Sequence, residues 1–137
     1  MCAAVVETDR LALRRFTDAD ARSLLEMLSD EEVTHFLPLI APRNLAEASA
    51  YIDERFLATY RAADRGERSD EGLPLDLHYA ICRKDDGAFL GYINVDADEA
   101  HDAGYALVRS AWGHGYAREA LAAMIEVARR AEFPYLT

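Results

Sequence analysis

The chain has 137 residues, of which 51% are hydrophobic and 29% charged, a balance typical of one soluble globular domain. It carries 15 Lys and Arg against 25 Asp and Glu, a formal net charge of −10 that disfavours a general nucleic-acid-binding surface. No apolar run approaches the roughly 20 residues that span a bilayer, so we expect no membrane partner. The N-terminus lacks a signal-peptide pattern, and Cys2 and Cys82 form neither a disulfide framework nor a metal-ligand cluster. We therefore expect a cytoplasmic protein without a metal site.

The first half of the chain predicts one strand followed by two helices. Residues 10–16 (RLALRRF) alternate apolar and polar side chains, which indicates a half-buried strand. Residues 18–28 carry leucines at helical spacing and are expected to form the first helix. A second helix is expected from Asn44 to about Ala63, because Asn44 can cap its first turn and Glu47 follows at the spacing of a capping box.

The second half predicts a β-hairpin, a further strand and a helix. Residues 75–84 and 89–95 read as the two hairpin strands, and residues 104–108 as the next strand. A helix is expected over residues 116–131, and residues 135–137 read as the start of a last strand. The expected apolar stripe of that helix comprises Ala117, Leu121, Met124, Ile125 and Ala128. This order predicts an α+β domain of three layers, with a mixed, mostly antiparallel sheet flanked by helices.

The segment richest in chemical information is residues 104–120 (GYALVRSAWGHGYAREA), in which a strand passes through a glycine-containing turn directly into a helix. The first turn of a helix has unpartnered N–H groups and a positive dipole end, both of which attract anions. Glycine lets the backbone approach a phosphate closely. The amides of residues 113–117, with Arg118 beside them, can therefore hold a pyrophosphate. The same spacing also fits a plain turn into a helix.

Two common phosphate-binding motifs are excluded here. No Gly-Lys-Ser/Thr follows the turn, which excludes a P-loop. The dinucleotide fingerprint is excluded because a third glycine is missing at the required offset and the turn follows a late strand instead of opening the fold.

Residues 112–120 (WGHGYAREA) resemble the acyl-CoA motif of the GNAT N-acetyltransferase family, especially its branch that acetylates ribosomal-protein N-termini. The family motif is Gln/Arg-x-x-Gly-x-Gly/Ala. Gly115 and Ala117 match its last two defined positions, while Trp112 stands where Gln or Arg is usual. Residues 7–14 (ETDRLALR) are similar to the opening strand of the family, and residues 79–93 to its central hairpin.

The resemblance implies an acetyl-CoA-dependent N-acetyltransferase in which an amine attacks the thioester carbonyl directly. The backbone N–H of Val108, or of a neighbour, would polarise that carbonyl. The acceptor would be a protein N-terminus or an amine-bearing small molecule. The residues implied to bind the coenzyme are Leu107, Val108, Gly113, His114, Gly115, Tyr116, Ala117 and Arg118.

The general base that removes the ammonium proton is left open. Candidates are Asp96, Glu99 and His101, with Asp98 and, less favoured, His78 beside them. Each of these residues can equally be a solvated group on a hairpin or strand edge.

The chain departs from the family at its end. Family members continue past the strand that begins at Tyr135 with a further helix and two strands. We therefore expect one N-acetyltransferase domain over residues 1–137 that is incomplete at its C-terminal end. Three explanations stay open: a truncated chain, a sheet completed by a partner chain such as a homodimer, and a silent member that binds acyl-CoA without turnover.

Overall fold

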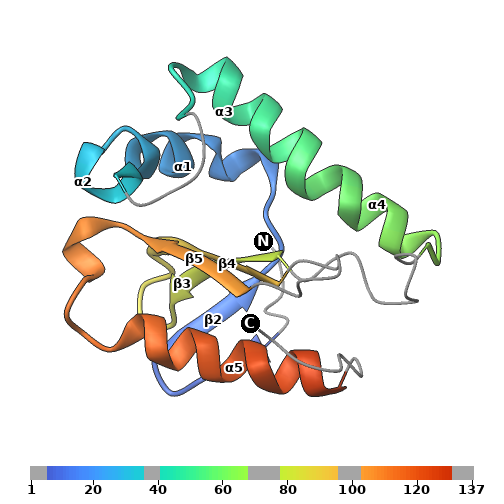
Figure 1. Ribbon diagram of the computed structural model, residues 1–137, viewed down its shortest axis with the longest axis vertical. Coiled ribbons are helices and arrows are strands. Elements are labelled where there is room, and N and C mark those ends of the chain that lie inside the picture. Colours follow the sequence, from blue (N-terminus) through green and yellow to red (C-terminus); the bar gives the residue numbers. More distant parts are fainter. Residues whose placement is uncertain (1–5, 36–40, 68–77, 96–102, 131–137) are drawn as a thin grey trace.

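The computed structural model describes residues 6–35, 41–67, 78–95 and 103–130 (Figure 1). Its centre is a five-stranded sheet in the order β1-β2-β3-β4-β5, in which every neighbouring pair is antiparallel. The strands are β1 (Val6–Glu7), β2 (Leu11–Arg14), β3 (His78–Arg83), β4 (Phe89–Val95) and β5 (Ala103–Leu107). The expected α+β class is confirmed. Residues 135–137, predicted to start a further strand, lie outside the described part.

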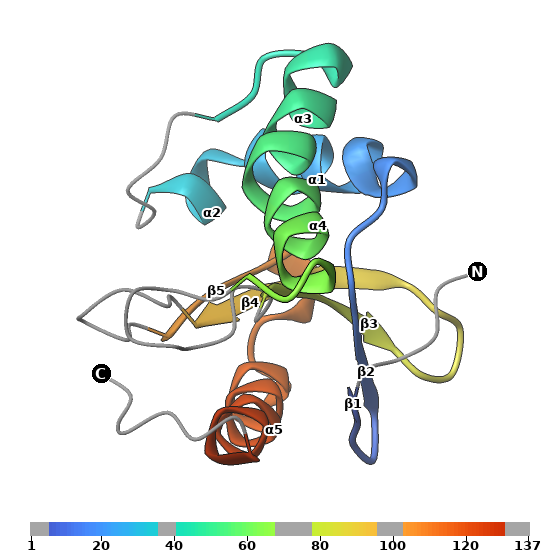
Figure 2. The same ribbon diagram turned by 90° about the vertical axis from the view of Figure 1, so that its right-hand side faces the viewer.

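Helices cover both faces of the sheet and make three layers (Figures 1 and 2). One face carries the described helices that precede β3, and the other face carries α5. The helices are α1 (Ala21–Leu28), α2 (Glu31–Thr34), α3 (Leu45–Ile52), α4 (Ala58–Asp64) and α5 (Tyr116–Arg130). None of the described helices is long and apolar enough to cross a membrane.

The second predicted helix forms with the expected cap. The Asn44 side chain accepts a hydrogen bond of 2.9 Å from the backbone N–H of Glu47, which satisfies one of the free donors of the first turn. Glu47 in turn accepts from the backbone N–H of Arg43 at 3.0 Å. A π-helical turn over Asp53–Leu57 joins α3 to α4. Local capping therefore accounts for the start of this long helical segment.

Two hydrophobic clusters lie on opposite faces of the sheet. Between the sheet and α1–α4, Phe16 and Phe56 stack with ring centroids 4.4 Å apart. Between the sheet and α5, the fully buried side chains include Leu11, Ile93 and Met124. Because strand side chains alternate between faces, β3, β4 and β5 each contribute to both clusters, whereas β1 and β2 contribute only to the cluster beneath α5.

The apolar stripe predicted for α5 is partly wrong. Met124 is buried as expected, but Ile125 is 41% exposed and Ala120 takes the other buried position. Residues 120 and 124 are four apart and share one face of the helix, whereas residue 125 is rotated by about 100° from residue 124. The face of α5 that packs on the sheet is therefore rotated from the predicted stripe, toward Ala120, Ala123 and Val127.

Strands β4 and β5 approach closely at Gly91, which has φ +154°. A Cβ built on Gly91 would lie 1.9 Å from the carbonyl oxygen of Ala106, so only glycine fits there. This close approach fixes the position of β5, and with it the position of the turn that follows.

Candidate acyl-group transfer site

The turn between β5 and α5 has the backbone that its two glycines permit. Gly113 and Gly115 each have φ +80°, a region that other residues rarely adopt. A short 3-10 helix, Arg109–Ala111, precedes them, and α5 begins at Tyr116. We call residues 113–117 the glycine turn. It brings five consecutive residues to the N-terminal end of a 15-residue helix, where the dipole favours an anion.

A cleft of about 470 Å³ opens beside the glycine turn. Five of the predicted coenzyme-binding residues line it: Leu107, Gly113, Gly115, Tyr116 and Ala117. Val33 of α2 and Tyr105 of β5 also line it, and the sequence did not mark either of them. The cleft therefore runs from the outer edge of β5 to the start of α5. His114 and Arg118 are exposed nearby and are not among its lining residues.

The backbone N–H of Val108 does not face the cleft, although the resemblance implies that it polarises the thioester carbonyl there. Its N–H donates a hydrogen bond of 2.8 Å to the carbonyl oxygen of Leu90, so it is turned into the sheet. Hydrogen-bonding direction alternates along an antiparallel strand, so Leu107 and Tyr105 direct their backbone groups to the outer edge of β5. Val108 itself lines a neighbouring cleft of about 210 Å³. The expected role of the Val108 N–H as the oxyanion donor therefore does not fit this geometry.

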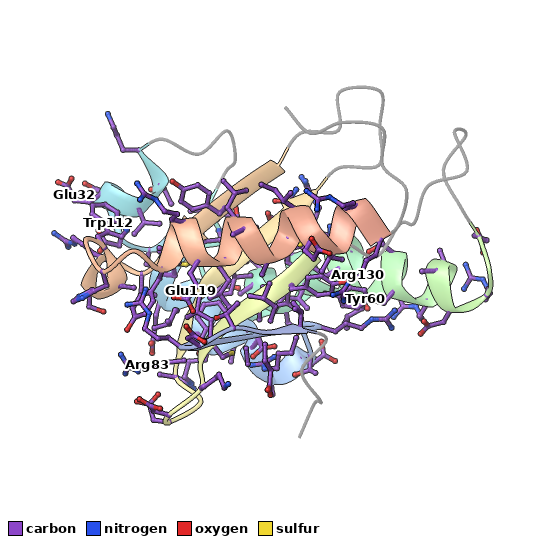
Figure 3. All side chains as sticks on the ribbon, turned by 90° about the horizontal axis from the view of Figure 1, so that it is seen from below. Glu32, Tyr60, Arg83, Trp112, Glu119 and Arg130 are labelled. Carbon is purple, nitrogen blue, oxygen red and sulfur yellow. The ribbon has the colours of Figure 1, made fainter. Side chains whose placement is uncertain are left out.

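Trp112 occupies part of that outer edge. Its indole Nε1 donates a hydrogen bond of 3.1 Å to the carbonyl oxygen of Leu107, and the residue is 42% exposed. Figure 3 places Trp112 at the N-terminal end of α5, opposite the end that carries Arg130. A large ring thus stands at the motif position where the family usually has Gln or Arg.

The β1–β2 hairpin contacts the glycine turn from outside the cleft. Arg10 donates from Nε to Oε1 of Glu119 at 2.8 Å and from Nη1 to the carbonyl oxygen of His114 at 2.8 Å. Its guanidinium carbon lies 4.5 Å from the centroid of the Tyr116 ring. The Thr8 hydroxyl also donates to Glu119. Figure 2 shows this hairpin running beside α5.

These contacts explain the ionisation of Glu119. Partial burial opposes ionisation, but hydrogen bonds from Thr8 and Arg10 outweigh it and hold the pKa of Glu119 below its ordinary value. Glu119 is therefore an anion in the first turn of α5, paired with Arg10. No sequence pattern pointed to this pairing.

The opposite face of the sheet carries an aromatic group beneath α3. Phe56 lies against the rings of Tyr51, His78 and Tyr92, at centroid distances of 5.8, 5.6 and 6.3 Å. Burial raises the pKa of the Tyr92 hydroxyl, so this tyrosine stays neutral. Asn94 is the register partner of His78 on this face. The base candidates Asp96, Asp98, Glu99 and His101 follow β4 and lie outside the described residues.

Comparison with known proteins agrees with this geometry. Residues 10–137 match the acetyltransferase (GNAT) domain family. The uncharacterized N-acetyltransferase YoaA of Bacillus subtilis is 30% identical over 125 residues, which make up 88% of this chain and 64% of that protein. The chain thus spans less than two thirds of the length of this relative.

Two solved structures show the same fold. An acetyltransferase from Agrobacterium tumefaciens superposes with a TM-score of 0.69 at 20% identity, over 99% of this chain and 73% of that one. RimL, a ribosomal L7/L12 alpha-N-protein acetyltransferase in complex with coenzyme A, superposes with a TM-score of 0.65 at 16% identity, over 93% of this chain and 68% of that one. With the family match over residues 10–137, the strand, glycine turn and helix identify this chain as a member of the acetyltransferase (GNAT) family.

Proposed function

We propose that this protein binds acetyl-CoA and transfers its acetyl group to a primary amine. The observation that carries the proposal is the cleft of about 470 Å³ that joins the outer edge of β5 to the glycine turn at the start of α5. This cleft offers backbone donors for a pyrophosphate and an extended strand edge for a long, thin chain. A family relative with this fold, RimL, is described in complex with coenzyme A.

The residues of the glycine turn fit a pyrophosphate. Gly113 and Gly115 have no Cβ to obstruct a bound anion, and the N–H groups of the first turn of α5 have no partners within the helix. His114 within this turn and Arg118 directly after it are exposed and can reach an anion from the outer side of the turn. The residues present therefore suit the coenzyme.

The outward backbone groups of β5 suit the remainder of the coenzyme. Tyr105 and Leu107 present their N–H and C=O groups to the cleft side of the strand. In place of Val108, we assign the N–H of Leu107 or Tyr105 as the donor that polarises the thioester carbonyl. When bound, acetyl-CoA supplies an activated thioester that an amine can attack without a covalent enzyme intermediate.

The acceptor is proposed as a protein N-terminus or a small amine. RimL, which shares the fold, acts on the N-terminus of a ribosomal protein, and the net charge of −10 of this chain favours approach of a cationic amine. Asp96, Glu99 and His101 stay proposed as candidates for the base that takes the ammonium proton. The chain itself supplies positioning and a route for that proton.

A titration of the whole chain with CoA tests the proposal. Trp112 is the only tryptophan and lines the cleft, so its fluorescence reports occupancy directly. We expect a saturable change with CoA, and release of free thiol when acetyl-CoA and an amine-bearing peptide are both supplied. Saturable binding without thiol release for any amine would identify a silent acyl-CoA-binding module. No change in fluorescence or in melting temperature would contradict the proposal.

A further inference from the structure

The turn that joins β1 to β2 is held rigidly beside α5. Its Thr8 N–H donates to the carbonyl oxygen of Leu11 at 2.8 Å, and the Leu11 N–H donates to the Thr8 hydroxyl at 3.0 Å. Lys84 of the next hairpin donates to the carbonyl oxygen of Thr8 at 3.0 Å. These hydrogen bonds therefore fix the backbone from which the Arg10 side chain extends.

Three donors of this turn converge on one carboxylate. Glu119 accepts from the Thr8 hydroxyl, from the Arg10 backbone N–H at 3.0 Å and from Arg10 Nε at 2.8 Å. The Glu119 side chain is 20% exposed and the Arg10 side chain 45% exposed. Figure 3 shows Glu119 on the side of α5 that faces the N-terminal strands. A charge-assisted pair with several hydrogen bonds is stronger and more directional than a simple surface ion pair.

Arg10 also fixes one peptide unit of the glycine turn. Its Nη1 holds the carbonyl oxygen of His114 at 2.8 Å, although the two residues are 104 positions apart. The C=O and N–H of a trans peptide point in opposite directions, so this bond turns the N–H of Gly115 away from Arg10. Gly115 lines the cleft, whereas Arg10 is not one of its lining residues. The peptide is thereby oriented with its donor toward the cleft side.

The glycine turn needs such an external contact. Glycines at φ +80° have low barriers to other backbone conformations, so a peptide between residues 113 and 116 can rotate at little steric cost. We propose that Arg10 and Glu119 are positioning residues that hold the glycine turn in the conformation that binds the pyrophosphate of CoA. This inference rests on the proposed function, and it assigns the N-terminal hairpin a part in coenzyme binding.

Two variants separate positioning from plain electrostatics. Glu119→Ala removes a negative charge beside an anion site, so electrostatics alone predicts tighter CoA binding, whereas loss of positioning predicts weaker binding. Arg10→Lys keeps the positive charge but cannot bridge Glu119 and His114 at once. We expect both variants to raise the Kd for CoA by about tenfold or more, since misplacement of a binding group is costly.

Pantetheine, which lacks all phosphates, is the matched ligand. It is titrated against the same variants with Trp112 fluorescence, and we expect its Kd to change by less than about twofold, because the outer edge of β5 is untouched. Arg43→Lys and Glu47→Ala serve as the control pair, since Arg43 and Glu47 form a similar ion pair of 3.0 Å at the start of α3. The control variants should bind both ligands as the wild type does.

Each outcome decides between the possibilities. Equal loss of CoA and pantetheine affinity in the Arg10 and Glu119 variants, or tighter CoA binding by Glu119→Ala, would overturn the positioning role. If a variant does not fold, Glu119→Gln and Thr8→Val interrupt the same contacts with less change and carry the same expectation. A wild-type chain that does not bind CoA would overturn the proposed function, and this inference with it. Normal CoA binding by every variant would overturn the positioning role alone.

Discussion

The indole Nε1 of Trp112 donates a hydrogen bond to the carbonyl oxygen of Leu107, and the two atoms are 3.1 Å apart. This hydrogen bond joins the residue that precedes the glycine turn to the outer edge of β5, and both residues line the cleft. The Leu107 carbonyl oxygen, an acceptor on the strand edge where the coenzyme is proposed to bind, therefore already accepts a hydrogen bond from the indole. A ligand that approaches the Leu107 carbonyl from the side that the indole occupies must displace the indole first.

This relationship predicts the behaviour of Trp112→Phe. The variant keeps an aromatic ring but has no donor for Leu107, so CoA no longer competes with the indole. We expect its affinity for CoA to increase by about fivefold, the equivalent of about 1 kcal/mol for one hydrogen bond. Calorimetric titration measures this, because the variant has no tryptophan. A weaker affinity would show that the indole contacts the ligand itself.

The close approach of β4 and β5 predicts the effect of Gly91→Ala. The added Cβ would lie 1.9 Å from the Ala106 carbonyl oxygen, so the strands must separate or the backbone of Gly91 must change. We expect the free energy of unfolding to fall by roughly 3 kcal/mol or more, measured by urea denaturation.

Gly87→Ala is the matched control for that change. Gly87 has φ +71° in the β3–β4 turn, and a Cβ there meets nothing within 4 Å. Its cost should be only the backbone strain of about 1–2 kcal/mol. Equal destabilisation by the two substitutions would contradict the close packing at Gly91.

The glycine turn predicts that Gly115→Glu abolishes CoA binding. The substitution strains a position with φ +80° and adds a negative charge to the turn that is proposed to bind the pyrophosphate. Its Cβ would lie 3.4 Å from Nη2 of Arg10, so the new carboxylate would also compete for the guanidinium that holds the His114 carbonyl. Gly87→Glu adds the same side chain at a positive φ, at a residue that does not line the cleft, and should bind CoA normally. Fluorescence titration of Trp112 compares the two, and unchanged affinity in Gly115→Glu would refute the assignment of the turn.

The lowered pKa of Glu119 predicts a pH dependence of stability. A carboxyl group whose pKa is lower in the folded state than in the unfolded state stabilises the protein at any pH above its pKa in the unfolded state. For Glu119 that pKa is about 4.5. That stability is lost as the pH falls through the lower, folded pKa. We expect the melting-temperature difference between wild type and Glu119→Gln to be greatest at neutral pH and to shrink on acidification below about pH 4.5. A constant difference down to pH 3 would show that the charge of Glu119 contributes nothing.

Local features were largely predictable from the sequence. The cap at Asn44 and the whole of β4 (Phe89–Val95) appear where they were expected. Each depends on side chains within a few residues of one another, through capping, turn preference or periodic burial. The β1 strand was not predicted separately, because two residues (Val6–Glu7) are too few to show a pattern. The exposure of Ile125 also needed the structure, since it depends on how far the sheet extends beneath α5.

The sequence by itself determined the order of the longer strands and helices, the family motif and the glycine turn, because each depends on residues that are neighbours along the chain. Tertiary structure alone decided that the Val108 N–H faces Leu90, since the direction of each strand N–H depends on the pairing register. It also decided that Arg10 meets Glu119, 109 positions away, and that Val33 borders the cleft. These contacts between distant segments arise because α5 packs across the sheet against β4 and β2, and the spacing of residues along the chain does not indicate that packing.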